Sequence, residues 1–288
     1  MTVYTPTARF DTGRALTETE MRRIAPSIFA TEAHVSRSDR FQPIPTFDVL
    51  RGLMREGFMP VGVKQSTARD PGKAAYTKHL IRLRRMDNAT AYQVGDTVCE
   101  ILLKNANDGT SAYDLMAGLF RVQCLNSMVA QTGTIDSVKV RHSGDVMGKV
   151  IEGTYRVLGE AQKALEAPVE WSRLQLRTEE RMAFASAVHA LRFGGTEEGE
   201  EPAGPAQAIK PVQMIAPRRA ADRAADLWTT FNVAQENVIR GGLHGIARDA
   251  NNRPRRVTTR AINGIDQDVK LNRALWVLTQ EMAKIKAA

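Results

Sequence analysis

The fold is decided by four runs of residues: VGVKQST (61–67), KHLIRLRR (78–85), CEILLKNAN (99–107) and YDLMAGLFRVQCLNSMVA (113–130). Apolar and polar residues alternate in them, which is typical of β-strands that bury one face. Asp-Pro-Gly at 70–72 and Asn-Asp-Gly at 107–109 separate the first two runs and the last two, and both triplets favour tight turns. The runs therefore predict four strands, paired as two antiparallel hairpins.

The hydrophobic period lengthens to that of a helix after these runs. Apolar residues recur on one helical face over 146–165, and the same spacing predicts later helices at 178–193, 221–240 and 265–286. Two short helices are expected before the strands, one opened by a capping box from Thr17 to Glu20 and one over 47–57. Because the strands come first in the chain and the helices follow, the sequence indicates an α+β fold. The expected architecture is a mostly antiparallel sheet of two hairpins, followed by a long helix and a helical C-terminal region.

Four segments are expected along the chain. Residues 194–207 read GGTEEGEEPAGPAQ, and a stretch so rich in Gly, Pro and Glu predicts a flexible acidic insert. The segments are an N-terminal helical and extended segment (1–59), a core of four strands and a helix (60–193), the insert (194–207) and a basic helical C-terminal region packed on the core (208–288).

The composition is that of an ordinary globular protein, with 43% hydrophobic and 25% charged residues. No apolar run approaches the length of a membrane span and the N-terminus lacks a secretory signal, so we expect a cytoplasmic protein without membrane contact. Cys99 and Cys124 lie in apolar runs away from other metal ligands, and both are expected to be reduced core residues.

Motifs for nucleotide turnover and for zinc are absent from the sequence. The segment GDVMGKV at 144–150 has three residues between its glycines, whereas a phosphate-binding loop requires four. The five histidines are scattered, and Asp266 and Asp268 fall in the first turn of a predicted helix, where the helix dipole alone favours carboxylates. We therefore expect no catalytic residue, no bound metal and no cofactor.

Basic residues favour a polyanionic partner, because the net charge is +8 and residues 208–288 alone contain 14 Lys or Arg against 7 Asp or Glu. Tyr76 and Tyr113, at the flanks of the hairpins, are the aromatic residues best placed to stack on bases. The predicted nucleic-acid contacts are Lys64, Lys78, Arg82, Arg84, Lys104, Arg121 and, in a loop within 247–263, Arg253, Arg255 and Arg256.

The strand KHLIRLRR carries the argument for a basic sheet face. Alternation places Lys78, Arg82 and Arg84 on one face, pointing away from the core, and Ile81 and Leu83 on the other. Such a face would bind phosphates without reading sequence. The same pattern also fits a sheet whose bases only keep an open surface soluble, and the loop at 247–263 equally fits a mobile surface loop.

Polar residues on predicted apolar elements are expected to be structural. Buried amides and carboxylates are costly unless they are bonded. The residues predicted to tie strand and helix ends through hydrogen bonds from side chain to backbone are Asn126, Asn232, Gln235, Glu236 and Asn272.

Several segments resemble a phage/plasmid-like protein family, the domain of unknown function 932. The segments are GLFRVQCLNSMVA (118–130), FNVAQENVIRGG (231–242) and RAINGIDQDVKLNRALWVLTQEMA (260–283). The resemblance implies a setting on plasmids, prophages and phages and little about chemistry. The order of strands and long helix is also similar to that of phage single-strand annealing proteins of the Red-beta and RecT type. That similarity implies an oligomer that holds single-stranded DNA, without ATP, between a basic hairpin and the long helix.

The sequence thus favours ATP-independent nucleic-acid binding by a homo-oligomer, with single-stranded DNA preferred and annealing in recombination as its role. Two alternatives stay open. Asp96, Glu100 and Lys104 would share one strand face and form a nuclease cluster. Alternatively, the C-terminal helices would bind host or phage proteins, and the protein would be a regulatory factor without enzymatic activity.

Overall fold

The chain folds as two compact units, Met1–Leu165 and Glu166–Ala288. The computed structural model describes residues 14–38, 41, 43–85, 97–122, 129–140, 146–164, 166–194, 208–248 and 252–287. Apart from Gly194, the predicted acidic insert lies outside these residues. The predicted packing of residues 208–288 on the core stays a prediction. Within the described ranges no helix combines the length and the apolar character that crossing a bilayer requires.

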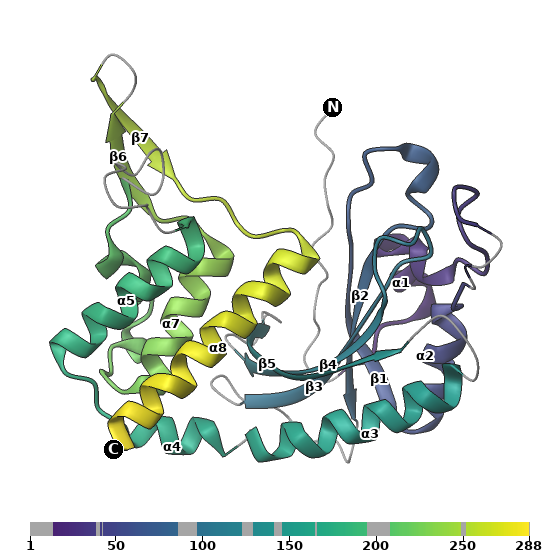
Figure 1. The fold of residues 1–288 in the computed structure, drawn as a ribbon, viewed down its shortest axis with the longest axis horizontal. Helices are drawn as coiled ribbons and strands as arrows, with labels where there is room; N and C mark the ends of the chain where they lie inside the picture. The colour runs from purple at the N-terminus through teal and green to yellow at the C-terminus, as the bar shows by residue number, and fades with distance from the viewer. Residues whose placement is uncertain are drawn as a thin grey trace. The chain divides into compact units, whose positions relative to one another are not determined.

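A five-stranded antiparallel sheet organises the first unit (Figure 1). Its strands are β1 (Phe58–Gln65), β2 (His79–Arg85), β3 (Thr97–Asn105), β4 (Tyr113–Val122) and β5 (Val129–Val140). They lie side by side in chain order, each antiparallel to the next. The α+β, antiparallel prediction is confirmed, and both predicted hairpins are present as β1 with β2 and β3 with β4. The sheet also contains a fifth strand, which the sequence did not predict.

The extra strand arises from the run at 113–130, which contains β4 and the start of β5. Few large apolar residues occur in QTGTIDSVKV (131–140), so the alternation that marks the other strands is weak there. Residues 123–128, which include Cys124 and Asn126, lie outside the described ranges. Cys99 is free and half-buried, and burial raises the pKa of its thiol to about 12.

One face of the sheet packs against helices and forms the core of the first unit. The helices are α1 (Glu18–Ile24), α2 (Thr46–Arg55) and α3 (Val146–Ala164), with 3-10 turns η1 (Pro26–Phe29) and η2 (Pro71–Lys73) between elements. The predicted capping box from Thr17 to Glu20 opens α1. Gly153 lets α3 approach the sheet, because a Cβ there would lie 3.2 Å from Leu115 Cδ1. The fully buried residues of this core include Ile81, Leu83, Leu115, Val150 and Val157.

A buried hydrogen-bond chain centred on His79 ties the N-terminal helices to the sheet. Asn105 Nδ2 lies 2.9 Å from Thr46 Oγ1, which lies 3.0 Å from His79 Nε2, and His79 Nδ1 lies 2.9 Å from Ser27 Oγ. The carbonyl of Thr77 also faces Nδ1 at 3.3 Å, so this nitrogen carries the proton and Nε2 accepts. All of the imidazole is buried, and this burial lowers the pKa of His79 to about 4.

The second unit is mainly helical. Its elements are α4 (Ala167–Arg173), α5 (Thr178–Phe193), η3 (Pro211–Ile215), η4 (Ala220–Asp222), α7 (Leu227–Arg240), β6 (His244–Arg248), β7 (Pro254–Thr258) and α8 (Ile265–Ala287). The predicted helices at 178–193 and 265–286 are confirmed, but the helix predicted from residue 221 begins only after Asp226, whose side chain caps it through Thr229 N. The core of this unit is an aromatic cluster of Trp171, Trp228, Phe231 and Trp276.

Buried amides join α7 to α8. Gln235 Nε2 donates to Asn272 Oδ1 over 3.0 Å, and Asn272 Nδ2 donates to the carbonyl of Asp268. Asn232 Nδ2 donates to the carbonyl of Trp228 within α7. The predicted side-chain to backbone bonds are therefore present for Asn232 and Asn272, whereas Gln235 bonds another side chain.

Candidate nucleic-acid interface

The two arginines at the centre of the predicted basic face are engaged inside the protein. Glu100 on β3 is fully buried, and its carboxylate accepts from Arg82 Nε at 2.7 Å and from Arg84 Nε at 3.1 Å. The Arg84 side chain is 2% exposed and that of Arg82 is 16% exposed. Both arginines alternate with the core residues Ile81 and Leu83, as predicted, but the expectation of an open basic face is wrong. Alternation assigns a side chain to a face and cannot tell whether that face is covered.

The other predicted contacts of the first unit that the structure describes are not fully exposed either. Lys104 lies 3.5 Å from Asp114 in an ion pair whose side chains are 14% and 9% exposed. Lys64 and Lys78 are half-buried, and the side chain of Arg121 is outside the described part of the structure. Tyr113 is fully buried, so the prediction that it stacks on bases is wrong.

The alternative nuclease cluster meets a similar obstacle. Both carboxylate oxygens of Glu100 accept from arginines, and Lys104 pairs with Asp114. Asp96 lies outside the described residues. Within the described ranges, no group of three His, Cys, Asp or Glu side chains is placed to hold a metal ion.

An exposed basic surface is found instead on the hairpin of β6 and β7. The segment predicted as a loop is a two-stranded ribbon, with Ile246 opposite Arg256 and Arg248 opposite Pro254. We call β6, β7 and the adjoining Arg253 the arginine ribbon. Figure 1 shows it extending away from α5, α7 and α8 of its own unit. Its four arginines are exposed: Arg248, Arg253, Arg255 and Arg256.

Arg248, Arg255 and Arg256 present their side chains at the surface of the ribbon. In the described part of the chain, neither Arg255 nor Arg256 has an ion pair with a carboxylate. Among the described residues, Arg248 Nη1 donates to a backbone carbonyl, that of Asn252, at 2.9 Å. Guanidinium groups held in this way keep their full charge and their donors for an external anion. The three predicted contacts Arg253, Arg255 and Arg256 therefore lie together on one exposed element.

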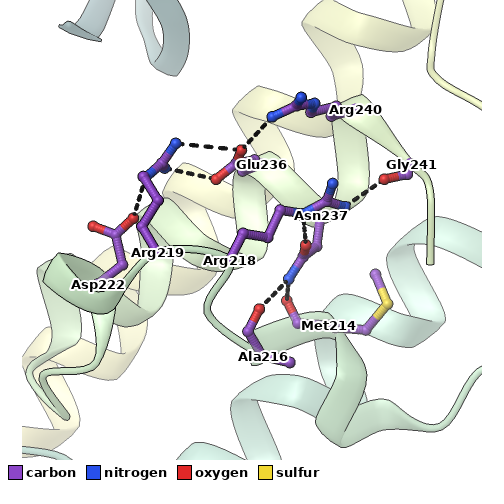
Figure 2. A network of polar contacts seen from close by, with 9 residues as sticks. All are labelled: Met214, Ala216, Arg218, Arg219, Asp222, Glu236, Asn237, Arg240 and Gly241. Carbon is purple, nitrogen blue, oxygen red and sulfur yellow. Dashed lines mark hydrogen bonds and ion pairs between the residues drawn. The ribbon is translucent and has the colours of Figure 1, made fainter. Parts of the chain in front are cut away.

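A polar network fixes the root of the arginine ribbon to α7 (Figure 2). Arg218 Nε donates to Asn237 Oδ1 over 2.7 Å, and its Nη2 donates to the carbonyl of Gly241, which ends α7. Asn237 Nδ2 in turn donates to the carbonyls of Met214 and Ala216 at 3.1 and 3.0 Å. Arg218 and Asn237 thus hold the end of α7, from which the chain runs into β6.

Glu236 stabilises the same region through charge. Its buried carboxylate accepts from Arg219 Nη2 at 2.7 Å and from Arg240 Nη1 at 3.0 Å, and Arg219 also pairs with Asp222 (Figure 2). A buried carboxylate requires such partners, because removing it from water is costly. The predicted structural role of Glu236 thus takes the form of ion pairs with side chains instead of bonds to the backbone.

Direct backbone contacts complete the root of the ribbon. Gln213 Nε2 donates to the carbonyl of His244 at 2.9 Å, and Arg192 Nη2 donates to the carbonyl of Arg260 at 2.7 Å. Gly245 packs so closely that a Cβ there would lie 2.0 Å from the carbonyl oxygen of Ala208. The ribbon therefore begins from a fixed base, while its arginines face solvent.

Comparison with known proteins places the chain in a family. The family model described as Domain of unknown function (DUF932) matches residues 33–276. The chain belongs to this family. UPF0380 protein YafZ of Escherichia coli (strain K12) is 43% identical over 269 residues, which are 93% of this chain and 92% of YafZ. UPF0380 protein YfjQ of the same strain is 42% identical over 269 residues, with the same coverage. No solved structure matches the chain.

In this DUF932 chain, the arginine ribbon lies inside the matched region, and the sequence contains a signal for it. HGIAR and PRRVT flank the turn-forming residues DANNR, and Val, Ile and Thr favour strands. The proline and the many arginines obscure this signal, because both residues are common in loops. Pro254 is tolerated because the ribbon has only two strands, so each strand has a free edge.

Proposed function

We propose that the protein binds nucleic acid without ATP and that the arginine ribbon makes the contacts to phosphate. The observation that carries this proposal is a fixed, exposed element with four arginines, of which Arg255 and Arg256 have no ion pair in the described part of the chain. Arginine suits phosphate because its planar guanidinium offers two parallel donors to the oxygens. The net charge of +8 adds a long-range attraction to polyanions.

The described residues favour the ribbon over the sheet as the main contact. Using Arg84 would require breaking a buried pair with Glu100, which costs several kcal/mol. Arg255 and Arg256 require no such rearrangement, because both are already exposed. The sheet residues of the first unit therefore have a structural role in this proposal.

Fluorescence anisotropy with labelled single-stranded DNA, duplex DNA and RNA, at several salt concentrations and without ATP, tests the proposal. Affinity is expected to fall with salt, by about 0.7 log units per log unit of salt for each single-strand phosphate neutralised. The double variant Arg255→Gln/Arg256→Gln should lower the affinity and reduce this slope by about 1.4 for single strands. Both residues are exposed, so its melting temperature should stay close to that of the parent.

A matched control is the double variant Arg22→Gln/Arg23→Gln. These neighbouring arginines on α1 are also exposed, so the control makes the same change in net charge at a different surface. It should leave the salt slope unchanged. Binding that is independent of salt, or equal losses in the two double variants, would contradict the ribbon as the contact. If no nucleic acid bound at all, binding of a protein partner would become the favoured function.

Strand annealing in a mobile genetic element is the finer form of this proposal. It is motivated by the order of strands and long helix in the sequence, which resembles that of phage annealing proteins. Mixing two complementary labelled strands with the protein tests it. Annealing should be accelerated without ATP in the parent and slowed in Arg255→Gln/Arg256→Gln, and the protein should run as an oligomer in light scattering.

A further inference from the structure

An open hollow of about 340 Å³ lies on the arginine ribbon. It is lined by His244, Gly245, Ile246, Pro254 and Arg256, which come from both strands. Its volume lies within the range of small-ligand sites, about 300–1,000 Å³. The hollow is therefore large enough to hold a small planar group between the side chains that line it.

The register of the ribbon explains how these side chains meet. Ile246 is opposite Arg256 and His244 is opposite Thr258, so His244, Ile246 and Arg256 project from the same face. Pro254 shares this face because it is two residues from Arg256 on the same strand. The alternate residue Ala247 is buried on the other face. One face of the ribbon is thus anchored and the other combines apolar and cationic groups at the surface.

Ile246 is the unusual member of this face, because its side chain is 70% exposed between arginines. A partner that offered only phosphates would leave it uncovered. A partner that carries a flat apolar group beside its phosphates would cover Ile246 and Pro254 and neutralise Arg256 at the same time. Nucleic acid has this combination, since a base is attached next to each phosphate.

The state of the base decides which nucleic acid fits. In a duplex the faces of the bases are covered by stacking, and only their edges are exposed in the grooves. In a single strand the faces are accessible and stack on His rings, arginine planes and similar flat surfaces. The imidazole of His244 is oriented for such a contact by Thr258 Oγ1, which lies 2.8 Å from Nδ1. An apolar hollow beside arginines therefore favours a single strand.

We propose that the hollow binds one unstacked base of a single-stranded nucleic acid, with Arg256, which lies on the same face, on a neighbouring phosphate. The proposal deepens the proposed function, on which it rests, by naming the substrate class. It assigns Ile246, Pro254 and His244 to contact with the base.

The experiment compares two labelled oligonucleotides of equal length, one of thymidines and one in which every base is absent, by anisotropy with the full chain. Both carry the same phosphates, so phosphate contacts contribute equally to the two affinities. The thymidine strand should bind about tenfold more tightly, as expected from stacking of a base. A duplex of the same length should bind less tightly than the thymidine strand, although it carries more phosphates, because its base faces are covered.

The variant Ile246→Ser separates the base contact from the phosphate contacts. It should lower the affinity for the thymidine strand several-fold and leave that for the strand without bases unchanged. Ile285→Ser is the matched control, because Ile285 on α8 is 68% exposed and lies outside the ribbon. It should change neither affinity. Melting temperatures near that of the parent are expected for both variants, since neither side chain is buried.

The outcomes distinguish this proposal from the proposed function. A preference for thymidines that Ile246→Ser removes supports the base site. Equal affinity of the parent for the two strands, or tighter binding of the duplex, overturns the base site and leaves phosphate binding by the ribbon intact. Absence of binding to every probe overturns both.

Discussion

Acidification is expected to destabilise the first unit through His79. The imidazole is neutral in the folded protein because burial lowers its pKa to about 4, while the unfolded chain has the ordinary value of 6.5. Between these two pH values the unfolded chain binds a proton that the folded protein does not bind. Stability is therefore complete above pH 6.5 and falls as the pH is lowered towards 4.

The size of the effect follows from the pKa difference. Each pKa unit corresponds to 1.36 kcal/mol, so the loss attributable to His79 reaches about 3 kcal/mol at pH 4. The buried chain of Ser27, His79, Thr46 and Asn105 has no carboxylate among its members, and Asp108 is the charge that favours the protonated ring. The His79 side chain has no exposed surface.

Urea unfolding followed by circular dichroism, at pH values from 7 to 4, measures the effect. His79→Gln provides the reference, because glutamine keeps a donor and an acceptor but does not titrate. Other carboxylates titrate in both proteins, so the difference between parent and variant isolates His79. The parent should lose about 3 kcal/mol of unfolding free energy relative to the variant over this range. A difference that stays constant with pH would refute the assignment of a buried neutral histidine.

Four further variants test the stability of the fold. Arg84→Glu should lower the free energy of unfolding in urea by about 3–5 kcal/mol, because it places a second carboxylate beside buried Glu100; an effect below about 1 kcal/mol would mean that the pair is not buried. Arg218→Met should cost about 2 kcal/mol and accelerate amide exchange at the start of β6, since it removes the bond to the Gly241 carbonyl. Arg240→Gln should cost less than about 1 kcal/mol, because Arg240 is 54% exposed, and equal costs in these two variants would contradict the network. Gly245→Ala should lower the melting temperature, since its Cβ would overlap the Ala208 carbonyl, and an unchanged value would show that the root of the ribbon can move.

The sequence alone was sufficient for features that depend on neighbours in the chain. The period of two in KHLIRLRR assigned Ile81 and Leu83 to the buried face, and the helical period assigned α3 and α8 within about two residues. The capping box from Thr17 to Glu20 marked the start of α1, since its hydrogen bonds span only three residues. These features follow from backbone geometry that each segment adopts by itself.

Only the tertiary structure decided which basic residues are available to a ligand. Arg84 and Arg256 are equally basic in the sequence, and both occur in strands. Arg84 lies in a central region of a five-stranded sheet beside buried Glu100, whereas Arg256 lies in a two-stranded ribbon away from its helices. Burial and pairing of a charge depend on segments far along the chain, which local patterns do not encode. For the same reason, the sequence supplied Arg253, Arg255 and Arg256 as candidates, while their gathering on an anchored ribbon with Ile246 came from the fold.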